Sequence, residues 1–438
     1  MPTIFAPITS PFRAGISIIR ISGSKTFECL QKLGFKGTAQ HQKISLHKIF
    51  DPKTAELIDE ALISFFKSPK SFTGEDVSEI SIHASPFISK KIFEILSRIE
   101  NVRFAEPGEF SKRAFLNGKL DLVQAEAIPD LIAAETAAQH KQALHQLSGK
   151  LGEIYENWRA RLIEISAKIE AAIDFPDEDL PKNIVEKVEA DVKNLTTEIK
   201  THLDDKKLGQ KIKDGFNLAI IGAPNVGKSS LINFLAQSEV AIVSEIAGTT
   251  RDIVETHLTI AGLPVKISDT AGLRQTSDKI EAEGIRRTLK KAESADLKIF
   301  MIDAENPFLR DEDKKIIDEN TILVMNKIDL FDDIKSAPEN CLKISLTNKT
   351  NTSALIKKLE EKILENFPNT SSPMITEERY RVILENSVAN LEKFSLKKNI
   401  ELAAEDLRMT TREIAKITGK VGVENILDII FSRFCIGK

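Results

Sequence analysis

One nine-residue stretch restricts the possible folds of this chain more than any other part of it. It reads Gly222-Ala223-Pro224-Asn225-Val226-Gly227-Lys228-Ser229-Ser230, between an apolar run at 218–221, typical of a buried strand, and residues 231–235, typical of a helix. The glycine-bounded loop, the Lys-Ser pair and this setting form the Walker A pattern. An ordinary turn between a strand and a helix would not require this combination of residues. Backbone N–H groups and the helix N-terminus of such a loop bind a polyphosphate. We expect Lys228 at the β- and γ-phosphates and Ser229 as a ligand of Mg²⁺.

Two further motifs follow predicted strands downstream of this loop. Asp269-Thr270-Ala271-Gly272 comes after 265–268, and Asn326-Lys327-Ile328-Asp329 comes after 321–325. Asp329 can accept two hydrogen bonds from guanine N1–H and N2–H, whereas adenine would leave this carboxylate without partners. The three motifs in this order match the GTPase superfamily and predict a Ras-like, doubly wound α/β domain. The loop that usually contacts guanine O6 is altered here to Ser345-Leu346-Thr347.

The segment between the phosphate loop and Asp269 is predicted to be the first switch loop, with Thr250 completing the Mg²⁺ shell. Leu273 stands where Ras-like GTPases have a glutamine that orients the attacking water. Leucine cannot polarise water, so we expect Asn225 to hold a K⁺ ion beside the phosphates and Glu281 to orient the water. The predicted K⁺ ligands are Asn225, Ser244, Ile246 and Thr249. The predicted GTP contacts are Asn225, Val226, Gly227, Lys228, Ser229, Ser230, Ser244, Glu245, Ile246, Ala247, Gly248, Thr249, Thr250, Asp269, Thr270, Ala271, Gly272, Asn326, Lys327, Ile328, Asp329, Ser345, Leu346 and Thr347.

The rest of the chain predicts two other kinds of domain. Strand signals at 16–21, 61–66 and 77–82 and a helix signal at 87–99 favour a compact α+β domain near the N-terminus. Helical periodicity marks residues 120–174, 181–206 and 377–438. We expect the helices on either side of the nucleotide domain to pack together, so that this domain is inserted into a helical one. The predicted domains are 1–118, 119–213, 214–370 and 371–438.

Composition excludes several classes of protein. The 438 residues carry a net charge of −4, which does not indicate a nucleic-acid binder. The apolar runs are too short to span a bilayer, and no secretory leader is seen, so we expect a cytoplasmic protein without membrane contact. Cys29, Cys341 and Cys435 lie far apart and predict neither a disulfide framework nor a metal site. No dinucleotide fingerprint is present, so any FAD would belong to a partner.

Several longer stretches are typical of one family. Besides Asn225 in the phosphate loop, they are Arg20-Ile21-Ser22-Gly23, Ser71-Phe72-Thr73-Gly74-Glu75-Asp76, 107–122, Gly248-Thr249-Thr250-Arg251-Asp252 and 431–438. With these motifs the chain resembles, over essentially its whole length, the bacterial and organellar tRNA-modification GTPases called MnmE or TrmE. The resemblance implies an N-terminal tetrahydrofolate-binding domain that dimerises, a helical domain and an inserted G domain.

The resemblance also implies roles for individual residues. Arg20, Glu79, Lys119 and Lys438 match the positions that contact a 5-formyl- or methylene-tetrahydrofolate. A carboxylate such as Glu79 can pair with the amide-like edge of a pterin, and cations suit the glutamate tail. Cys435 is implied to be a catalytic residue near the modification chemistry, whereas the residues alone leave an inert cysteine as the alternative.

The function implied by the resemblance is the modification of certain tRNAs. As a homodimer, and in a heterotetramer with the FAD-dependent protein MnmG (GidA), the chain would add an aminomethyl or carboxymethylaminomethyl group to C5 of the wobble uridine, U34. The one-carbon unit would come from tetrahydrofolate, and GTP hydrolysis with bound K⁺ would act as a conformational clock. The alternative is an RNA- or ribosome-associated assembly GTPase without modification chemistry. Such proteins carry RNA-binding appendages, and no basic–aromatic interleaving indicates one here.

Overall fold

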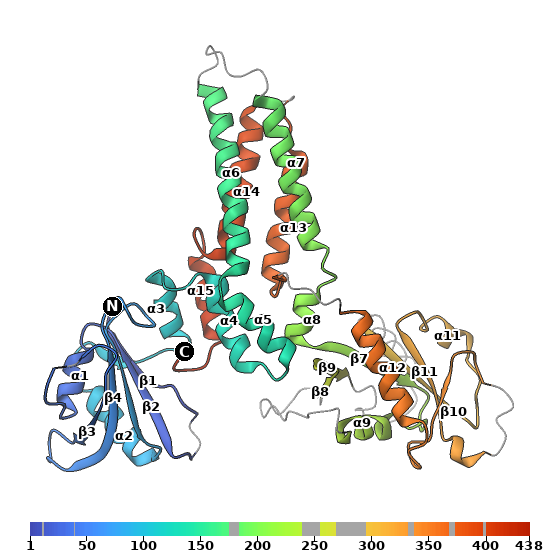
Figure 1. The fold of residues 1–438 in the computed structure, drawn as a ribbon, viewed down its shortest axis with the longest axis horizontal. Coiled ribbons are helices and arrows are strands. Elements are labelled where there is room, and N and C mark those ends of the chain that lie inside the picture. The colour runs from blue at the N-terminus through green and yellow to red at the C-terminus, as the bar shows by residue number, and fades with distance from the viewer. Residues whose placement is uncertain are drawn as a thin grey trace, which may run out of the picture. The chain divides into compact units, whose positions relative to one another are not determined.

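The computed structural model describes residues 1–10, 13–38, 40–174, 184–238, 255–268, 295–331, 337–367, 373–396 and 400–438. The internal contacts of the chain divide it into two compact units (Figure 1). The first unit contains Met1–Ile132, His145–Thr197 and Ile383–Lys438, and the second contains Ala133–Leu144 and Glu198–Val382.

The N-terminal part of the first unit is built on a six-stranded mixed sheet. Its strands are β1 (Thr3–Pro7), β2 (Ile16–Ser22), β3 (Ile44–Phe50), β4 (Leu57–Phe66), β5 (Val77–His83) and β6 (Val102–Phe104), in the order β3-β4-β5-β2-β1-β6. All neighbours are antiparallel except β1 and β6, which are parallel. Helices α1 (Thr26–Lys32) and α2 (Pro86–Leu96) cover one face through a core that includes Leu30, Ile92 and Leu96. The α+β prediction is confirmed, and β1, β3 and β6 were not predicted.

Helices complete the first unit. They are α3 (Glu109–Leu116), α4 (Leu122–Ala133), α6 (Lys150–Asp174), α14 (Ile400–Thr418) and α15 (Glu424–Ser432), with parts of α5 (Ala137–Leu147), α7 (Ile184–Leu203) and α13 (Glu378–Lys393). Arg408 of α14 donates a 2.9 Å hydrogen bond to Glu170 of α6. Thus helices on either side of the inserted segment in the sequence pack together, as predicted (Figure 1).

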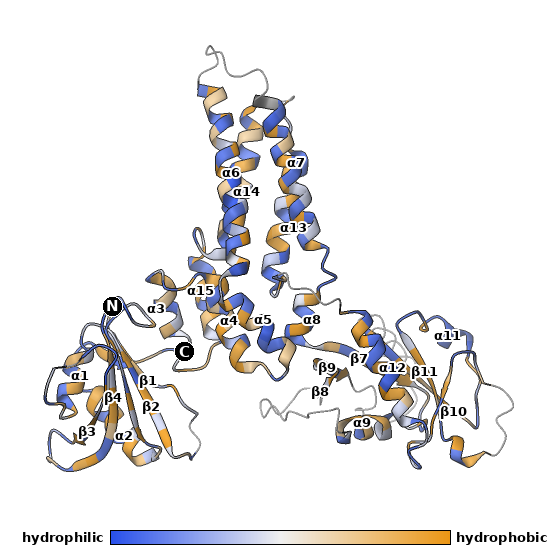
Figure 2. Cartoon of the chain, in the orientation of Figure 1, coloured by the Kyte–Doolittle hydropathy of each residue, from blue (hydrophilic) through white to orange (hydrophobic). Residues whose placement is uncertain are grey.

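The stretch 120–174, which carries helical periodicity in the sequence, forms three helices. Thr136 and Gln139 start α5 with a capping box, in which each side chain pairs with the backbone N–H of the other. Gly149 has φ +85°, a left-handed conformation that favours glycine, and it separates α5 from α6. Figure 2 shows hydrophilic and hydrophobic residues alternating along the longer helices, which fits partly buried helices. No helix among the described residues has the length and apolar character to cross a membrane.

The second unit holds a six-stranded sheet in the order β12-β11-β10-β7-β9-β8. The strands are β7 (Phe216–Gly222), β8 (Glu255–Ile260), β9 (Leu263–Ser268), β10 (Leu297–Asp303), β11 (Thr321–Asn326) and β12 (Leu342–Lys343). The first five strands of that order are parallel, whereas the edge strand β8 runs antiparallel to β9. The short turn through Ala261 and Gly262 makes β8 and β9 a hairpin, which is why β8 is antiparallel.

Apolar side chains cover both faces of this sheet. On one face, Leu231 and Leu235 of α9 (Lys228–Gln237) and Leu355 and Leu359 of α12 (Thr352–Glu365) pack against the strands. The other face has a separate core, to which the residues after α11 (Asp311–Lys314) contribute. The short elements α8 (Leu208–Asp214) and η1 (Ile328–Leu330) complete the described part of the unit. Helices on both faces of a mainly parallel sheet confirm the doubly wound α/β prediction.

Candidate functional site

The phosphate loop lies between the end of β7 and the start of α9, and its backbone conformation requires small residues. Gly222 has φ +153°, and a Cβ on it would lie 2.3 Å from the Met301 main-chain oxygen. Gly227 has φ +102°, and a Cβ there would lie 2.3 Å from the side-chain nitrogen of Asn326. Asn225 has φ +63°, a left-handed conformation that asparagine tolerates well. The motif glycines therefore serve close packing, and the loop ends directly at the N-terminus of α9, which favours anions.

The Lys228 side chain folds over this loop. Its ammonium group donates hydrogen bonds to the main-chain oxygens of Gly222 at 2.9 Å and Ala223 at 2.7 Å. Ser229 and Ser230 are exposed in the first turn of α9. A cation and two hydroxyl groups thus stand at a glycine-shaped helix N-terminus, a set of donors that fits a polyphosphate with a Mg²⁺ ion.

Asn326 joins the phosphate loop to the other two loops of the predicted guanine site. It is almost fully buried at the end of β11, and its side chain donates a 2.9 Å hydrogen bond to the Val226 main-chain oxygen. The Asn326 side-chain oxygen accepts a 3.2 Å hydrogen bond from the Leu346 backbone N–H. The Leu346 side chain also lies close to Gly227, since a Cβ added to this glycine would be 3.7 Å from it. One asparagine therefore fixes the relative positions of three sequence motifs.

The residues beside Asn326 are arranged to leave one carboxylate open to solvent. Lys327 has φ +64° and donates a 2.5 Å hydrogen bond to Asp303. Asp329 lies in η1 and is exposed. Ser345 is fully buried, and its hydroxyl accepts a 3.0 Å hydrogen bond from the Asn348 backbone N–H, so it shapes the altered loop that ends with the exposed Thr347.

Part of the predicted GTP site lies outside the described residues. This applies to the switch residues Ser244, Glu245, Ile246, Ala247, Gly248, Thr249 and Thr250, to Asp269, Thr270, Ala271 and Gly272, and to Glu281. Of the predicted metal ligands, the described part of the chain contains Ser229 for Mg²⁺ and Asn225 for K⁺. Among the described residues, no three His, Cys, Asp or Glu side chains are grouped so as to hold a metal ion.

A second cluster of predicted site residues lies in the first unit. Arg20 of β2 donates hydrogen bonds of 2.9 and 2.8 Å to one carboxylate oxygen of Glu79, directly opposite on β5. Its guanidinium carbon lies 5.1 Å from the centre of the Phe72 ring and 5.6 Å from that of Phe110. Arg20 is therefore held in one orientation by a carboxylate and two aromatic rings, each a favourable contact for a guanidinium.

The C-terminal turn of the chain packs beside this cluster. The Phe110 backbone N–H donates a 3.1 Å hydrogen bond to the Lys438 oxygen, and the Gly108 N–H donates one of 3.4 Å to the Cys435 oxygen. Burial lowers the pKa of the Lys438 ammonium, and the positive charge of the Arg20 guanidinium lowers it further. Two cations held near each other form a site suited to an anionic ligand.

The other residues of the predicted folate site are also described. Lys119 is exposed, and its ammonium donates a 3.1 Å hydrogen bond to the Pro69 main-chain oxygen in the loop that also carries Phe72. Cys435 is exposed within the C-terminal turn. The structure thus brings Arg20, Glu79 and Lys438 together, and the hydrogen bond to Pro69 joins Lys119, which lies between α3 and α4, to the loop that carries Phe72.

Sequence reasoning assigned no role to four residues of this region, namely Phe72, Glu75, Phe110 and Arg113. One signal could have indicated Arg113: it lies three residues after Phe110 on the apolar side of α3, where helical periodicity expects a core residue. A charged side chain at a core position predicts a buried ion pair.

Known proteins resemble both the N-terminal part and the remainder of this chain. The profile of the MnmE helical domain matches residues 122–435, and that of the GTP-binding protein TrmE N-terminus matches residues 3–119. A relative from Rickettsia akari (strain Hartford), named tRNA modification GTPase MnmE, is 47% identical over 446 residues and covers 100% of both chains. A relative of the same name from Rickettsia rickettsii (strain Sheila Smith) is 48% identical over the same length and coverage.

Among solved structures, the G domain of the Thermotoga maritima FeoB iron transporter is 25% identical, covering 35% of this chain and 99% of that chain, with a TM-score of 0.24. The full-length matches confirm the resemblance, and the chain belongs to the MnmE (TrmE) family of tRNA modification GTPases.

Proposed function

We propose that this protein hydrolyses GTP and uses the resulting conformational change in the modification of tRNA. The observation that carries the GTP part is the link from Asn326 to Val226 and Leu346, which holds a phosphate-binding loop and a guanine-type loop at a fixed separation. The modification part rests on the full-length relatives, whose name is tRNA modification GTPase MnmE.

The proposed reaction adds an aminomethyl or carboxymethylaminomethyl group to C5 of the wobble uridine, U34. Tetrahydrofolate supplies the one-carbon unit, in its 5-formyl or methylene form. The cluster of Arg20, Glu79 and Lys438 supports this proposal, because it offers a carboxylate for the pterin edge and cations for anionic groups. Lys119, whose ammonium group contacts the loop that carries Phe72, adds a further cation. Cys435 lies in the turn that brings Lys438 to this site, so we propose that it lines the modification site.

The division of labour follows the predicted domains. Residues 1–118 bind folate, 214–370 bind GTP, and 119–213 with 371–438 form the helical domain. In the GTP site Ser229 and Thr250 hold Mg²⁺, while Asn225, Ser244, Ile246 and Thr249 hold K⁺. Glu281 orients the attacking water. FAD is bound by a partner, MnmG (GidA), with which the protein forms a heterotetramer.

Exposed apolar side chains support the proposed homodimer. Leu46 of β3 and Leu62 of β4 face each other across the strands with exposed fractions of 64% and 45%, and Ile44 lies next to them on the same face at 66%. Such a row on the open face of a sheet is typical of an interface. A double variant, L46K with L62K, should sediment as a monomer in analytical ultracentrifugation, whereas K90A, at an exposed lysine of α2 on the other face of the sheet, should stay dimeric.

Nucleoside analysis of bulk tRNA tests the function as a whole. Cells lacking this chain should lose the C5-modified wobble uridine, and the wild-type chain should restore it. K228A should fail to restore it because the phosphate loop has lost its cation, while K112A, at a lysine outside that loop, should succeed. An assembly GTPase without modification chemistry remains the alternative, and it predicts unchanged nucleosides together with defective ribosome assembly.

A further inference from the structure

Arg20 of the proposed folate site is oriented by elements that lie outside its own strand. Phe72 belongs to the loop between β4 and β5, and Phe110 belongs to α3. The position of the guanidinium therefore depends on how this loop and this helix are held against each other and against β2.

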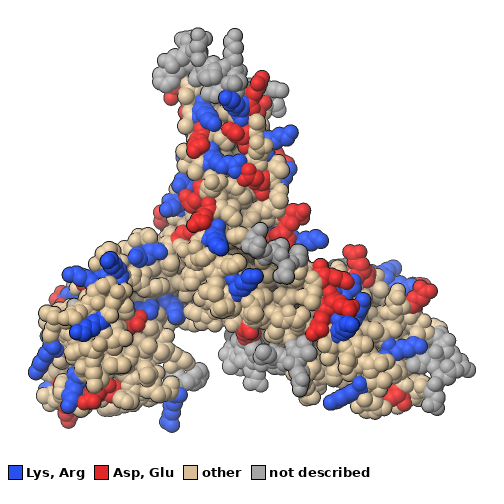
Figure 3. Space-filling view, viewed as in Figure 1, with Lys and Arg blue, Asp and Glu red and all other residues tan. Residues whose placement is uncertain are grey.

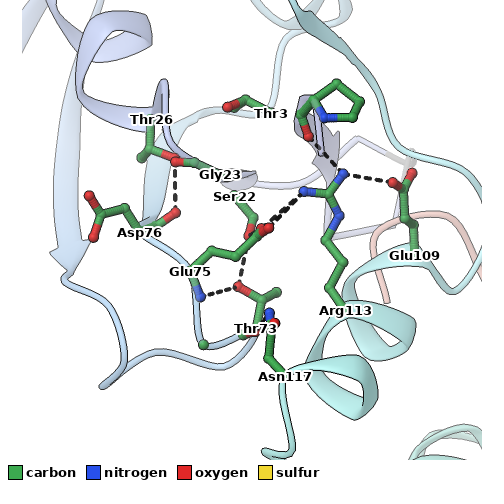
Figure 4. A network of polar contacts seen from close by, with 12 residues as sticks. Thr3, Ser22, Gly23, Thr26, Thr73, Glu75, Asp76, Glu109, Arg113 and Asn117 are labelled. Carbon is green, nitrogen blue, oxygen red and sulfur yellow. Dashed lines mark hydrogen bonds and ion pairs between the residues drawn. The ribbon is translucent and has the colours of Figure 1, made fainter.

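A single buried arginine ties the loop to the helix. Arg113 of α3 is only 2% exposed. The two terminal nitrogens of its guanidinium group donate the hydrogen bonds that its side chain makes. One nitrogen donates to both carboxylate oxygens of Glu75, in the loop, at 3.1 and 3.0 Å. The other donates to Glu109 of α3 and to the Pro2 main-chain oxygen, both at 2.8 Å. Figure 4 shows the guanidinium between these acceptors.

The same network reaches the strand that carries Arg20. The Ser22 hydroxyl donates a 2.6 Å hydrogen bond to Glu75 and lies 2.7 Å from the Thr73 hydroxyl (Figure 4). Ser22 follows Arg20 by two residues on β2, so both side chains point to the same face of the sheet. Asn117, at the end of α3, donates a 2.7 Å hydrogen bond to the Thr73 main-chain oxygen. Loop, helix and strand thus meet at one set of hydrogen bonds.

We propose that Arg113 and Glu75 are positioning residues for Arg20: their ion pair sets the loop that places Phe72 against the guanidinium and the helix that places Phe110 on it. This inference rests on the proposed binding of folate at Arg20. A shift of the loop releases one ring from Arg20, and the guanidinium then turns away from the orientation that Glu79 and the ligand require. Preorganised binding groups of this kind depend on the residues that support them.

Calorimetric titration of the full chain with 5-formyltetrahydrofolate tests the proposal. R113K keeps the charge but cannot contact Glu75, Glu109 and Pro2 together, so the Kd should rise about tenfold, a size typical of coupling between contacting residues. E75Q keeps the shape of the Glu75 side chain but removes its charge, and it should also raise the Kd. The matched control is R103K, because Arg103 pairs with Glu109 at 2.7 Å from the other side and has no hydrogen bond to the loop. R103K should leave the Kd unchanged.

A double-variant cycle separates positioning from general stabilisation. Because Arg113 acts in part through Phe72, adding R113K to F72L should raise the Kd by less than the tenfold that R113K causes in the wild-type chain. The proposal would be overturned if the effects of R113K and F72L on the Kd multiplied. It would also be overturned if R113K kept the wild-type Kd, or if R113K and R103K weakened binding equally. Absence of folate binding by the wild-type chain would instead refute the proposed function, and with it the inference. The far-ultraviolet circular dichroism spectrum of each variant, recorded at the titration temperature, should equal that of the wild type, which shows that the chain is folded.

Discussion

The side-chain nitrogen of Asn326 donates a 2.9 Å hydrogen bond to the main-chain oxygen of Val226, joining two motifs that lie 100 residues apart. The other end of the same amide accepts a hydrogen bond from Leu346. The group that fixes the guanine-type loop therefore also fixes the phosphate loop.

Replacing Asn326 by alanine should weaken GTP binding at least about tenfold. It leaves the buried Val226 main-chain oxygen without a partner, at a cost of about 1–3 kcal/mol, and it also removes the acceptor of the part-buried Leu346 N–H. Fluorescence titration with a labelled GTP analogue measures the loss. N348A is the control, since Asn348 is exposed in the same loop region and contributes its backbone N–H, which alanine keeps. Equal affinities of N326A and wild type would show that the loops are held by other contacts.

GTP hydrolysis should be faster in K⁺ than in Na⁺, and the N225G variant should lose this difference. Glycine adopts the φ of +63° at this position without strain, so the substitution removes the amide and keeps the loop. N340G is a matched control, because Asn340 has φ +58° and is exposed elsewhere in the same domain. Phosphate release assays in the two salts give the rates. Equal rates for the wild type would contradict a cation site at Asn225.

The D329N variant should prefer xanthosine to guanosine nucleotides, with GTP weakened at least about a hundredfold. The amide replaces an acceptor by a donor, which suits the oxygen that xanthine carries at C2. Competition binding with the two nucleotides measures the preference. D311N, at an exposed aspartate of the same domain, should keep the selectivity for GTP. Retained GTP selectivity in D329N would mean that another residue reads the base.

Acid should destabilise the N-terminal part of the protein through Glu109. Burial raises the pKa of this carboxyl, but hydrogen bonds from Arg103 and Arg113 outweigh burial and lower the pKa below its usual value. A lowered pKa contributes stability above the pKa of the unfolded chain, and this contribution is lost as the pH falls through the folded-state pKa. Urea unfolding at neutral pH and near pH 3 measures how much of the free energy of unfolding is lost in acid. This loss should be smaller for E109Q than for the wild type. E106Q, at the neighbouring exposed carboxyl, should behave like the wild type.

Alanine at Lys119 should weaken the binding of 5-formyltetrahydrofolate about tenfold, because a charge-assisted contact to an anionic ligand is lost. Calorimetry provides the Kd, and K112A is the control, since Lys112 pairs with Asp428 on α15. An unchanged Kd in K119A would remove Lys119 from the proposed site without affecting the case for Arg20.

Local patterns in the sequence were sufficient for much of the nucleotide domain. The apolar run before Gly222 became β7, and the run before Asn326 became β11. The antiparallel edge strand β8 was not foreseen, because period and apolar content do not specify the direction of a neighbouring strand. The domain borders at 118, 213 and 370, and the roles of Thr250 and Glu281, stay predictions.

The sequence by itself determined a phosphate loop, a guanine-type motif and helices that flank them, since each depends on residues close together in the chain. The tertiary structure alone decided that Phe72 and Phe110 face Arg20, that Lys438 approaches it, and that Arg113 supports the arrangement. These contacts join residues tens to hundreds of positions apart. No local periodicity encodes such distances, because they arise from how whole strands and helices pack.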